Sequence, residues 1–462
     1  MMMGRQAEPD RLFYDFCLED HVPQDHLLRR IDHFLDLDGI RRALKPYYSD
    51  FGRPSIDPEL LVRMLIVGYC FAIRSERRLC EEVHLNLAYR WFCRLGLDGN
   101  VPDHSTFSLN RNSRFRDSDM LRHLFETVVQ RCMSEGLVGG ESFAVDASLI
   151  QADANKQRSV PSDEWDRAKI PATATRAVKD YLSTLDDAAF GAASTKVPKF
   201  ISPADPAAQW TGALRGPAFF AYATNYLIDT ENAVIVDVEA SRAIRQAEVG
   251  AARTMIDRVA ERFDIRPERL AADTAYGTAD NLAWLVNEKN IAPHIPVFDK
   301  SKRDDGTFSR KDFRYDPQED CHVCPNGKQL KRYRLASRLA KANPPKDGLH
   351  RYRASKPDCD ACDLKLQCCP KDPARKVLRS IHEEARDVAR EIAKTEAYEI
   401  SRKNRKKVEM LFAHLKRILK LGRLRLRGPN GARDEFLLAA TVQNLRKLAK
   451  LRPEPPPNAL RA

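Results

Sequence analysis

Three carboxylates lie in surroundings where an unpaired charge would be costly. Asp146 and Asp273 each sit in a short apolar segment, next to alanine or valine. Burying such a side chain requires a cation or a set of hydrogen bonds. Glu409 is the single acid among eleven lysines and arginines between residues 402 and 427, a local charge of +10. Each of the three acids is therefore a candidate ligand for a cation.

Three converging carboxylates support a well-defined chemistry. Hard oxygen ligands suit Mg²⁺ or Mn²⁺, and two such ions activate a nucleophile and stabilise the leaving oxygen during in-line attack on a phosphodiester. Surrounding lysines and arginines would then position the polyanion. Taken singly, each acid is more simply explained as a helix cap, a turn residue or a salt-bridge partner, so spacing alone leaves the choice open.

Periodicity indicates which elements carry these acids. Residues 142–150 follow two glycines and are predicted to form a buried strand. Asp146 is expected at the end of its buried part, and Asp273 at the end of another short strand. Glu409 lies on a helix beside an apolar stripe, so it borders the core and can reach a sheet edge. The predicted order is strands 142–150, 219–229 and 233–240, helix 246–263, strand 270–274, helix 281–290 and strand 292–298.

Length and composition limit the class of protein. The chain has 462 residues, a net charge of +12 and 43 % hydrophobic residues, which is enough for several domains and too apolar for wholesale disorder. The longest apolar stretch, 64–73, is too short to span a membrane, and the N-terminus shows no apolar signal region. We therefore expect a soluble intracellular protein with no membrane partner.

Positive charge is concentrated in two regions. The run around Glu409 attracts polyanions such as nucleic acid, although a charge run can also be only a solvated face. Residues 1–135 are predicted to be helical, and exposed arginines between short helices would suit a helix-turn-helix-like DNA reader; a plain helical bundle is the alternative. These arginines are Arg74, Arg77, Arg78, Arg90, Arg94, Arg111, Arg114 and Arg116.

Three sequence strings resemble those of bacterial insertion-sequence DDE transposases. They are VDASLIQADANK, LAADTAYGTADNL and RKNRKKVEMLFAHLKRILKLGRLRLRG. The resemblance implies an α/β fold with a ribonuclease-H-like mixed sheet as catalytic core, an N-terminal all-helical domain and a cysteine-containing insertion before the catalytic glutamate. It also implies that Asp146, Asp273 and Glu409 are catalytic and bind two Mg²⁺ ions, for which Mn²⁺ can substitute.

The family's signature around the glutamate is Tyr-x2-Arg-x3-Glu-x6-Lys. This chain has Arg405 and Lys416 in place, whereas residue 402 is arginine. The resemblance assigns Arg405 and Lys416 to phosphates of the transposon end. Tyr276, three residues after Asp273, either lines the site or packs in the core. The predicted DNA-binding residues are Arg405, Lys416, Lys406, Lys407 and Arg417.

Six of the eleven cysteines lie between residues 321 and 369. Four of them form two Cys-x2-Cys pairs, and four thiolates in such pairs suit tetrahedral Zn²⁺. Disulfides are unfavourable in a reducing cytosol. The predicted structural Zn²⁺ would fold a small basic insertion, and the part played by Cys368 and Cys369 stays open. Its predicted ligands are Cys321, Cys324, Cys359 and Cys362.

The resulting hypothesis is a DNA transposase of the bacterial cytoplasm, associated with the nucleoid. It would bind terminal inverted repeats as a homodimer, cut a strand at each end and join the freed 3′-hydroxyl to target DNA. A metal-dependent nuclease without strand transfer and a non-catalytic DNA-binding repressor derived from a transposase are the alternatives. The predicted parts are a helical DNA-binding domain (1–135), the first part of the core (136–299) with a long irregular excursion (151–215), the insertion (300–394), the C-terminal core helices (395–451) and a tail (452–462).

Overall fold

The computed structural model describes residues 16–49, 51, 55–166, 173–194, 197–212, 216–298, 306–333 and 348–452, and the predicted tail beyond residue 452 lies outside these ranges. The chain divides into two compact units. The first unit contains the chain up to Leu137, residues 150–154 and the chain from Ala413 onward, and the second contains Val138–Leu149 and Asn155–Phe412. Across the described ranges, no helix is long and apolar enough to cross a membrane.

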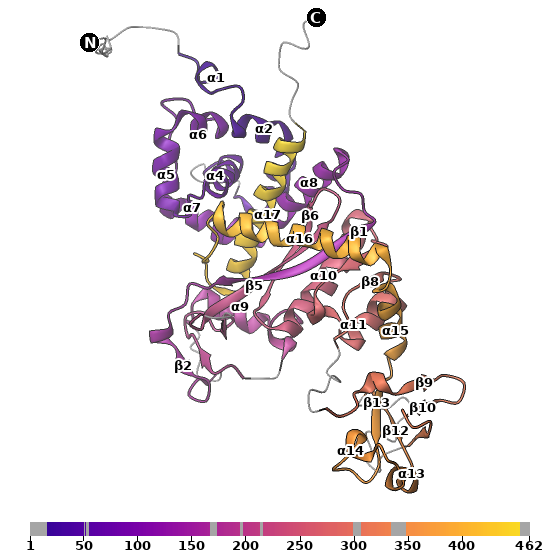
Figure 1. Ribbon diagram of the computed structural model, residues 1–462. Helices are drawn as coiled ribbons and strands as arrows, with labels where there is room; N and C mark the ends of the chain where they lie inside the picture. The colour runs from indigo at the N-terminus through magenta and orange to yellow at the C-terminus, as the bar shows by residue number, and fades with distance from the viewer. Residues whose placement is uncertain are drawn as a thin grey trace, which may run out of the picture. The chain divides into compact units, whose positions relative to one another are not determined.

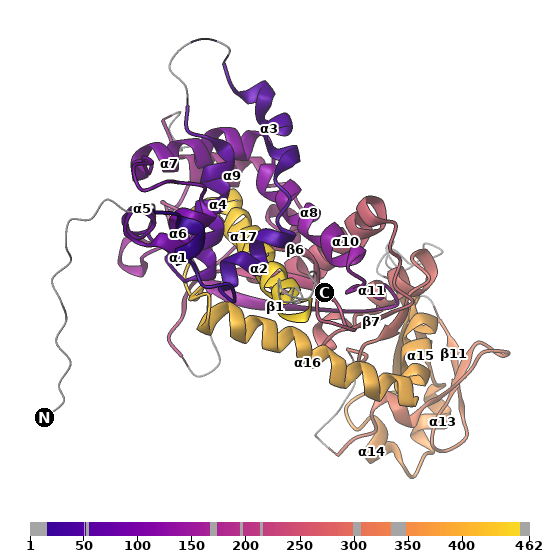
Figure 2. The ribbon, with the colours of Figure 1, turned by 90° about the horizontal axis from the view of Figure 1, so that it is seen from above.

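Helices build the first unit, as predicted for the N-terminal region (Figures 1 and 2). α4 shows why they form where they do, because Pro58 lies in its first turn and the Asp57 side chain accepts a hydrogen bond from the Glu59 N–H. The N-terminal helices are α1 (Leu18–His21), α2 (Leu27–Phe34), α3 (Asp38–Leu44), α4 (Pro58–Cys70), α5 (Glu76–Leu85), α6 (Leu87–Phe92), α7 (His104–Asn110) and α8 (Met120–Ser134).

The last helix, α17 (Gly428–Leu451), also belongs to the first unit. It packs against α2, α4 and α8 (Figure 2). The sequence predicts both C-terminal helices in the catalytic core, whereas α17 belongs to the helical unit. The physical reason is that most residues of α17 are buried, and that its buried acids have partners within the first unit, Arg74 for Glu435 and Arg116 for Asp434.

A mixed sheet forms the centre of the second unit. Its strands are β1 (Ser142–Gln151), β4 (Gln209–Thr211), β5 (Phe219–Asp229), β6 (Ile235–Arg242), β7 (Arg269–Ala271) and β8 (Ala292–His294). Their order is β4-β5-β1-β7-β8, with β6 also paired to β5. β1, β7 and β8 are parallel, whereas β5 runs antiparallel to β4 and β6.

Two helices follow the strands in the predicted order. α10 (Arg245–Phe263) packs on β5 and β6, and α11 (Ala279–Ala283) lies between β7 and β8 in the chain (Figure 1). A mixed α/β sheet together with an N-terminal helical region confirms the predicted fold class and is consistent with a ribonuclease-H-like core.

The stretch predicted as an irregular excursion, 151–215, contains regular elements. Besides β4 it holds β2 (Val160–Pro161), α9 (Arg176–Ser183) and β3 (Phe200–Ile201), and β2 pairs with β3. β4 joins the main sheet through β5. These elements are too short for hydrophobic periodicity to reveal them, which is why the sequence suggested none.

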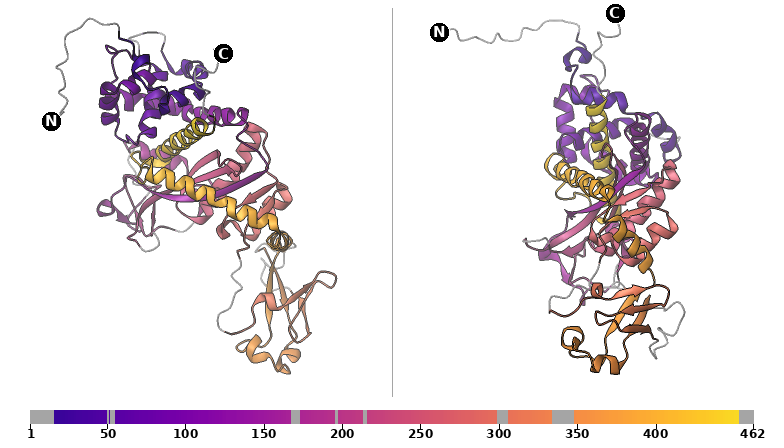
Figure 3. Two further views of the ribbon diagram at one scale, coloured as in Figure 1. Left: turned by 45° about the horizontal axis from the view of Figure 1, so that its top comes forward. Right: turned by 45° about the vertical axis from the view of Figure 1, so that its right-hand side comes forward.

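The predicted insertion contains a five-stranded antiparallel sheet of its own (Figure 3). Its strands are β9 (Arg314–Asp316), β10 (Cys321–Val323), β11 (Gln329–Arg332), β12 (Leu349–Arg353) and β13 (Lys376–Ser380), in the order β13-β12-β11-β10-β9. Two short helices, α13 (Lys356–Asp360) and α14 (Lys365–Cys368), lie between β12 and β13 in the chain. α15 (Glu383–Ile392) contacts α11 and β8, and α16 (Glu396–Arg417) follows it.

Candidate active site

Asp146 lies in the middle of β1, and not at its end as predicted, because the strand continues to Gln151. Its carboxylate accepts a hydrogen bond from the Ala147 N–H at 2.8 Å, and its Oδ2 lies 3.1 Å from Arg405 Nη1. The side chain is only 20 % exposed. Burial raises the pKa of Asp146 to about 6, although the Ala147 N–H and Arg405 both lower it.

Asp273 follows β7 and is brought beside Asp146 by the register of the parallel pair. Ala144 of β1 is opposite Ala271 of β7, and each aspartate lies two residues further along its own chain. The Asp273 side chain accepts a hydrogen bond from the Ala275 N–H at 2.8 Å, so it begins a short 3₁₀ turn. Its negative charge helps to raise the pKa of Asp146, which places the two carboxylates in one electrostatic environment.

The third acid reaches this pair through an arginine. Arg405 and Glu409 lie one turn apart on α16, with Arg405 Nη2 3.3 Å from Glu409 Oε1. The same guanidinium pairs with Asp146, so Arg405 bridges the strand acid and the helix acid. Glu409 is 54 % exposed, and its charge also contributes to the raised pKa of Asp146.

As they stand, these carboxylates are held apart. Within the described part of the chain, no three Asp, Glu, His or Cys side chains are grouped so that they could hold a metal ion. Arg405 provides the positive charge between Asp146 and Glu409 instead. The donor set itself, three carboxylates without nitrogen or sulfur ligands, has the chemistry that Mg²⁺ and Mn²⁺ require.

The other predicted DNA-binding cations have different surroundings. Lys406, Lys416 and Arg417 are exposed. Lys407 instead donates hydrogen bonds from Nζ to the carbonyl oxygens of Thr230, at 2.6 Å, and Glu231, at 3.2 Å. Because these two carbonyls belong to the turn between β5 and β6, Lys407 fastens α16 to that turn.

One acidic residue near the site was missed by sequence reasoning. Glu248 lies in the first turn of α10, and the charges of Asp273 and Asp146, together with burial, raise its pKa to about 7. No local signal distinguishes Glu248, because acids are common in the first turn of any helix. Tyr276, whose role stayed open, is 2 % exposed and interacts electrostatically with the same carboxylates.

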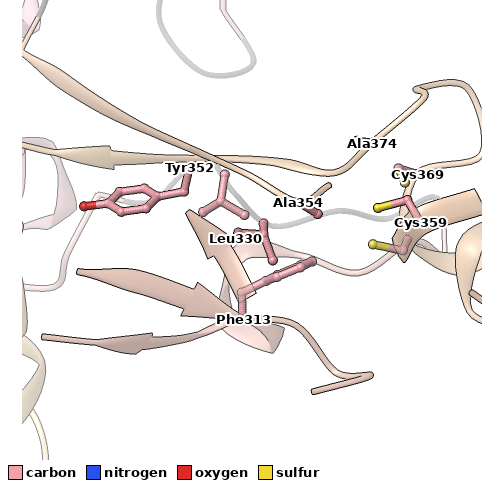
Figure 4. Close-up of a cluster of buried hydrophobic side chains, with 9 residues drawn as sticks. Phe313, Leu330, Tyr352, Ala354, Cys359, Cys369 and Ala374 are labelled. Atoms are coloured by element: carbon pink, nitrogen blue, oxygen red, sulfur yellow. The ribbon is translucent and has the colours of Figure 1, made fainter. Parts of the chain in front are cut away.

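The insertion gathers five cysteines around one small pocket. Cys359, Cys368 and Cys369 belong to its hydrophobic cluster, in which Cys359 and Cys369 lie next to each other (Figure 4). Cys321, a predicted zinc ligand, does not line this pocket, because it lies on β10, paired with Asp316 and Lys331 of the neighbouring strands. The cysteines lining the pocket are Cys324, Cys359, Cys362, Cys368 and Cys369.

The N-terminal arginines correct a second expectation. Four of the eight predicted to be exposed are largely buried and bonded within the first unit. Arg74 pairs with Glu435, and Arg90 donates hydrogen bonds to backbone carbonyls such as that of Gly99, at 2.7 Å. Arg111 pairs with Glu76 and Arg116 with Asp434. Arg77, Arg78 and Arg94 are exposed, as predicted.

Two protein families match parts of the chain. The family described as "Transposase domain (DUF772)" matches residues 16–113, and the one described as "Transposase DDE domain" matches residues 323–449. Glu409 lies inside the second match, whereas Asp146 and Asp273 lie outside both. No curated protein matches the chain. Among solved structures, the piggyBac transposase synaptic complex with hairpin DNA, determined by cryo-EM, matches 92 % of this chain and 75 % of that chain, with 10 % identity and a TM-score of 0.36.

Both family matches are to transposase domains, and the mixed sheet and the helical N-terminal region agree with that class of protein. Within that class, the two matches support an insertion-sequence DDE transposase, the family that its sequence strings resemble.

Proposed function

We propose that this transposase binds the terminal inverted repeats of its own element and catalyses Mg²⁺-dependent DNA cleavage and strand transfer through Asp146, Asp273 and Glu409. The observation that carries the proposal is that Arg405 pairs with both Asp146 and Glu409, while the register of β1 and β7 brings Asp273 beside Asp146. A purely structural role would not require Asp273 next to an aspartate that is already paired, because the mutual repulsion of the two carboxylates lowers stability.

The residues of the site divide the task. When bound, Mg²⁺ supplies an activated nucleophile and neutralises charge at the leaving oxygen, and Mn²⁺ can substitute for it. Asp146 on β1 and Asp273 directly after β7 would hold the ions, together with Glu409 on α16. Arg405 turns from these carboxylates to a DNA phosphate, with which a guanidinium forms a bidentate pair.

Exposed cations on α16 extend the DNA-binding surface. Lys406, Lys416 and Arg417 are free to contact phosphates of double-stranded DNA. A transposon has two ends and each chain has one such group of acids, so we expect a homodimer to assemble on both ends. The protein would act in the bacterial cytoplasm, on DNA of the nucleoid.

A cleavage assay tests this function. The full chain is incubated with Mg²⁺ and DNA that carries the repeats flanking its own reading frame. Wild type should cut at the repeat boundary, whereas Asp146→Asn, Asp273→Asn and Glu409→Gln should lose cleavage and still bind the ends. Glu399→Gln is the matched control, because Glu399 is an exposed acid on the same helix. Cleavage by all three site variants would overturn the proposal.

The same assay separates the alternatives. Cut ends that are never joined to target DNA would identify a nuclease without strand transfer. Binding without cutting in both Mg²⁺ and Mn²⁺ would identify a repressor, and would leave the basic helix as a docking surface only.

Structural zinc in the insertion is a second part of the proposal. Its expected ligands are Cys324, Cys359 and Cys362, with one thiol from Cys368 or Cys369, because these cysteines line one pocket. A turn after Cys324, in which the Gly327 N–H donates to the Cys324 carbonyl at 2.8 Å and Gly327 has φ +71°, presents the first thiol. Burial raises the pKa of Cys368 to about 12, so a metal would have to displace its proton.

Metal analysis of the purified protein tests the zinc. We expect one Zn²⁺ per chain in wild type and a strong loss of zinc in Cys324→Ser. Cys321→Ser is the matched control and should keep its zinc, because Cys321 lies outside the pocket. Equal zinc in both variants, or none in wild type, would contradict this ligand set.

A further inference from the structure

Glu248 lies near Asp146 and Asp273, but the function proposed above assigns it no role. It is carried by α10, which contacts the 3₁₀ turn that Asp273 begins. Its carboxylate interacts with Asp273 and Asp146, and Arg245 is the cation that faces it. Within the described residues, Glu248 has no ion pair or side-chain hydrogen bond, so repulsion from two aspartates is not offset by a direct partner.

A buried hydroxyl beside these carboxylates is also unpartnered. Tyr276 is 2 % exposed, and in the part of the chain that the structure describes its hydroxyl has no hydrogen-bond partner. Burial and the negative charges of Glu248, Asp146 and Asp273 all raise the pKa of this hydroxyl. A buried hydroxyl without a hydrogen bond is costly, so its place next to three acids indicates a polar occupant such as a hydrated cation.

The charges of the group lead to the same conclusion. When all four are ionised, Glu248, Asp146, Asp273 and Glu409 carry four negative charges, and Arg405 and Arg245 are the two cations that face them. Two negative charges are left over, and a third is added when Arg405 turns to DNA. Divalent cations are the natural compensation for carboxylates gathered in this way.

We propose that Glu248 is a fourth acidic residue of the site, which binds the divalent cations together with Asp146 and Asp273, and that the Tyr276 hydroxyl bonds to the water or carboxylate oxygens around them. The proposal rests on the function proposed above. Its alternative is that Glu248 merely stabilises the N-terminus of α10 through the helix dipole.

Two measurements distinguish a metal-binding role from a helix-stabilising one. The first is Mn²⁺ binding to the full-length protein without DNA, measured as the loss of the EPR signal of the free ion. Glu248→Gln should raise the Mn²⁺ concentration for half-saturation about tenfold or more, as should Asp146→Asn. Glu261→Gln is the matched control, because Glu261 is an exposed acid on the same helix, and it should bind Mn²⁺ as wild type does.

The second measurement is thermal unfolding with EDTA and with Mn²⁺. If Glu248 is crowded by like charges, Glu248→Gln should melt higher than wild type in EDTA and gain less from Mn²⁺. If it only stabilises the helix, the variant should melt lower in EDTA and gain as much as wild type. Glu248→Asp keeps the charge and should restore part of the Mn²⁺ binding.

The outcomes separate this inference from the proposed function. Wild-type Mn²⁺ binding by Glu248→Gln, with binding lost in Asp146→Asn, overturns the role of Glu248 and leaves the three-acid site standing. Wild-type binding by both variants overturns both proposals.

Discussion

Four arginines of the N-terminal region, Arg74, Arg90, Arg111 and Arg116, look in sequence like the exposed cations of α16 but occupy the opposite environment. Arg74 is 9 % exposed and pairs with Glu435, which is 2 % exposed. Lys403 and Lys406 are exposed and form no ion pair with the described residues. A cation can bind a DNA phosphate only if it is not already paired with an acid of the chain. Counting basic residues therefore does not locate a DNA-binding surface.

Glu435→Ala is expected to have the largest effect on this comparison. Glu435 pairs with Arg74 and also accepts hydrogen bonds from the N–H groups of Arg425, at 2.6 Å, and Leu426, at 2.7 Å. Its removal leaves a buried guanidinium uncompensated, which costs about 3–5 kcal/mol. Denaturant unfolding should show this loss of stability.

The control for Glu435→Ala is Glu399→Ala, which removes the exposed partner of Arg402 and should cost under about 1 kcal/mol. Equal losses in the two variants would show that the buried and exposed pairs do not differ in energy.

Asp146→Asn is expected to have the next largest effect on stability. Asp146 is the largely buried partner of Arg405, a cation of α16. The pKa of Asp146 is raised to about 6, whereas an unfolded aspartate titrates near ~3.9. Between these values the folded state binds more protons, so stability falls as pH rises through this window. Without metal at pH 7.5, the variant should be more stable by up to about 3 kcal/mol.

Denaturation in EDTA at two pH values checks the sign of this effect. The gain should shrink to under about 1 kcal/mol near pH 4, where Asp146 is protonated in the native state and about half protonated in the unfolded state. A variant less stable than wild type at pH 7.5 would mean that the ion pair with Arg405 outweighs the cost of burial.

How much of this could be foreseen differs between local and long-range features. The order of the core strands and the positions of Asp146 and Asp273 follow from short apolar segments, since periodicity is a local property. Arg74 and Glu435 are 361 residues apart, and nothing near either one announces the pair. Glu248 is hidden for the same reason, because its neighbours in space come from other elements.

The cysteines show a limit of spacing itself. Two Cys-x2-Cys pairs suggested four equivalent ligands, yet the structure leaves Cys321 out and brings Cys368 and Cys369 in. Cys321 lies within β10 and pairs with residues of both neighbouring strands, whereas Cys324 follows the end of this strand and begins a turn. Which thiols line the pocket therefore depends on where β10 ends, and the spacing of the cysteines does not contain that information.

A smaller effect is expected for Lys406→Ala. Lys406 is exposed and has no ion pair with the described residues, so we expect it to contact DNA and to contribute little to stability. Lys406→Ala should reduce the slope of log affinity against log salt by about 0.9, the value of one phosphate contact. Stability should change by no more than about 0.5 kcal/mol, because the side chain is exposed.

Fluorescence anisotropy with terminal-repeat DNA at several salt concentrations measures the effect of Lys406→Ala. Lys289→Ala is its control, since Lys289 already pairs with Asp257 at 2.5 Å. An unchanged slope in Lys406→Ala would place the DNA-binding surface elsewhere.

Lys407→Met has the smallest expected effect on DNA binding and gives the sharpest contrast, because Lys407 is the neighbour of Lys406 on the same helix. Its Nζ is bonded to the Thr230 and Glu231 carbonyls, so it behaves like the bonded arginines of the first unit. We expect a stability loss of about 0.5–1.5 kcal/mol, the net value of such hydrogen bonds, and an unchanged salt slope for DNA. If Lys407→Met instead lowers the salt slope of DNA affinity as Lys406→Ala does, Lys407 leaves the turn when DNA binds. A hydrogen bond within the protein would then not exclude a cation from binding DNA.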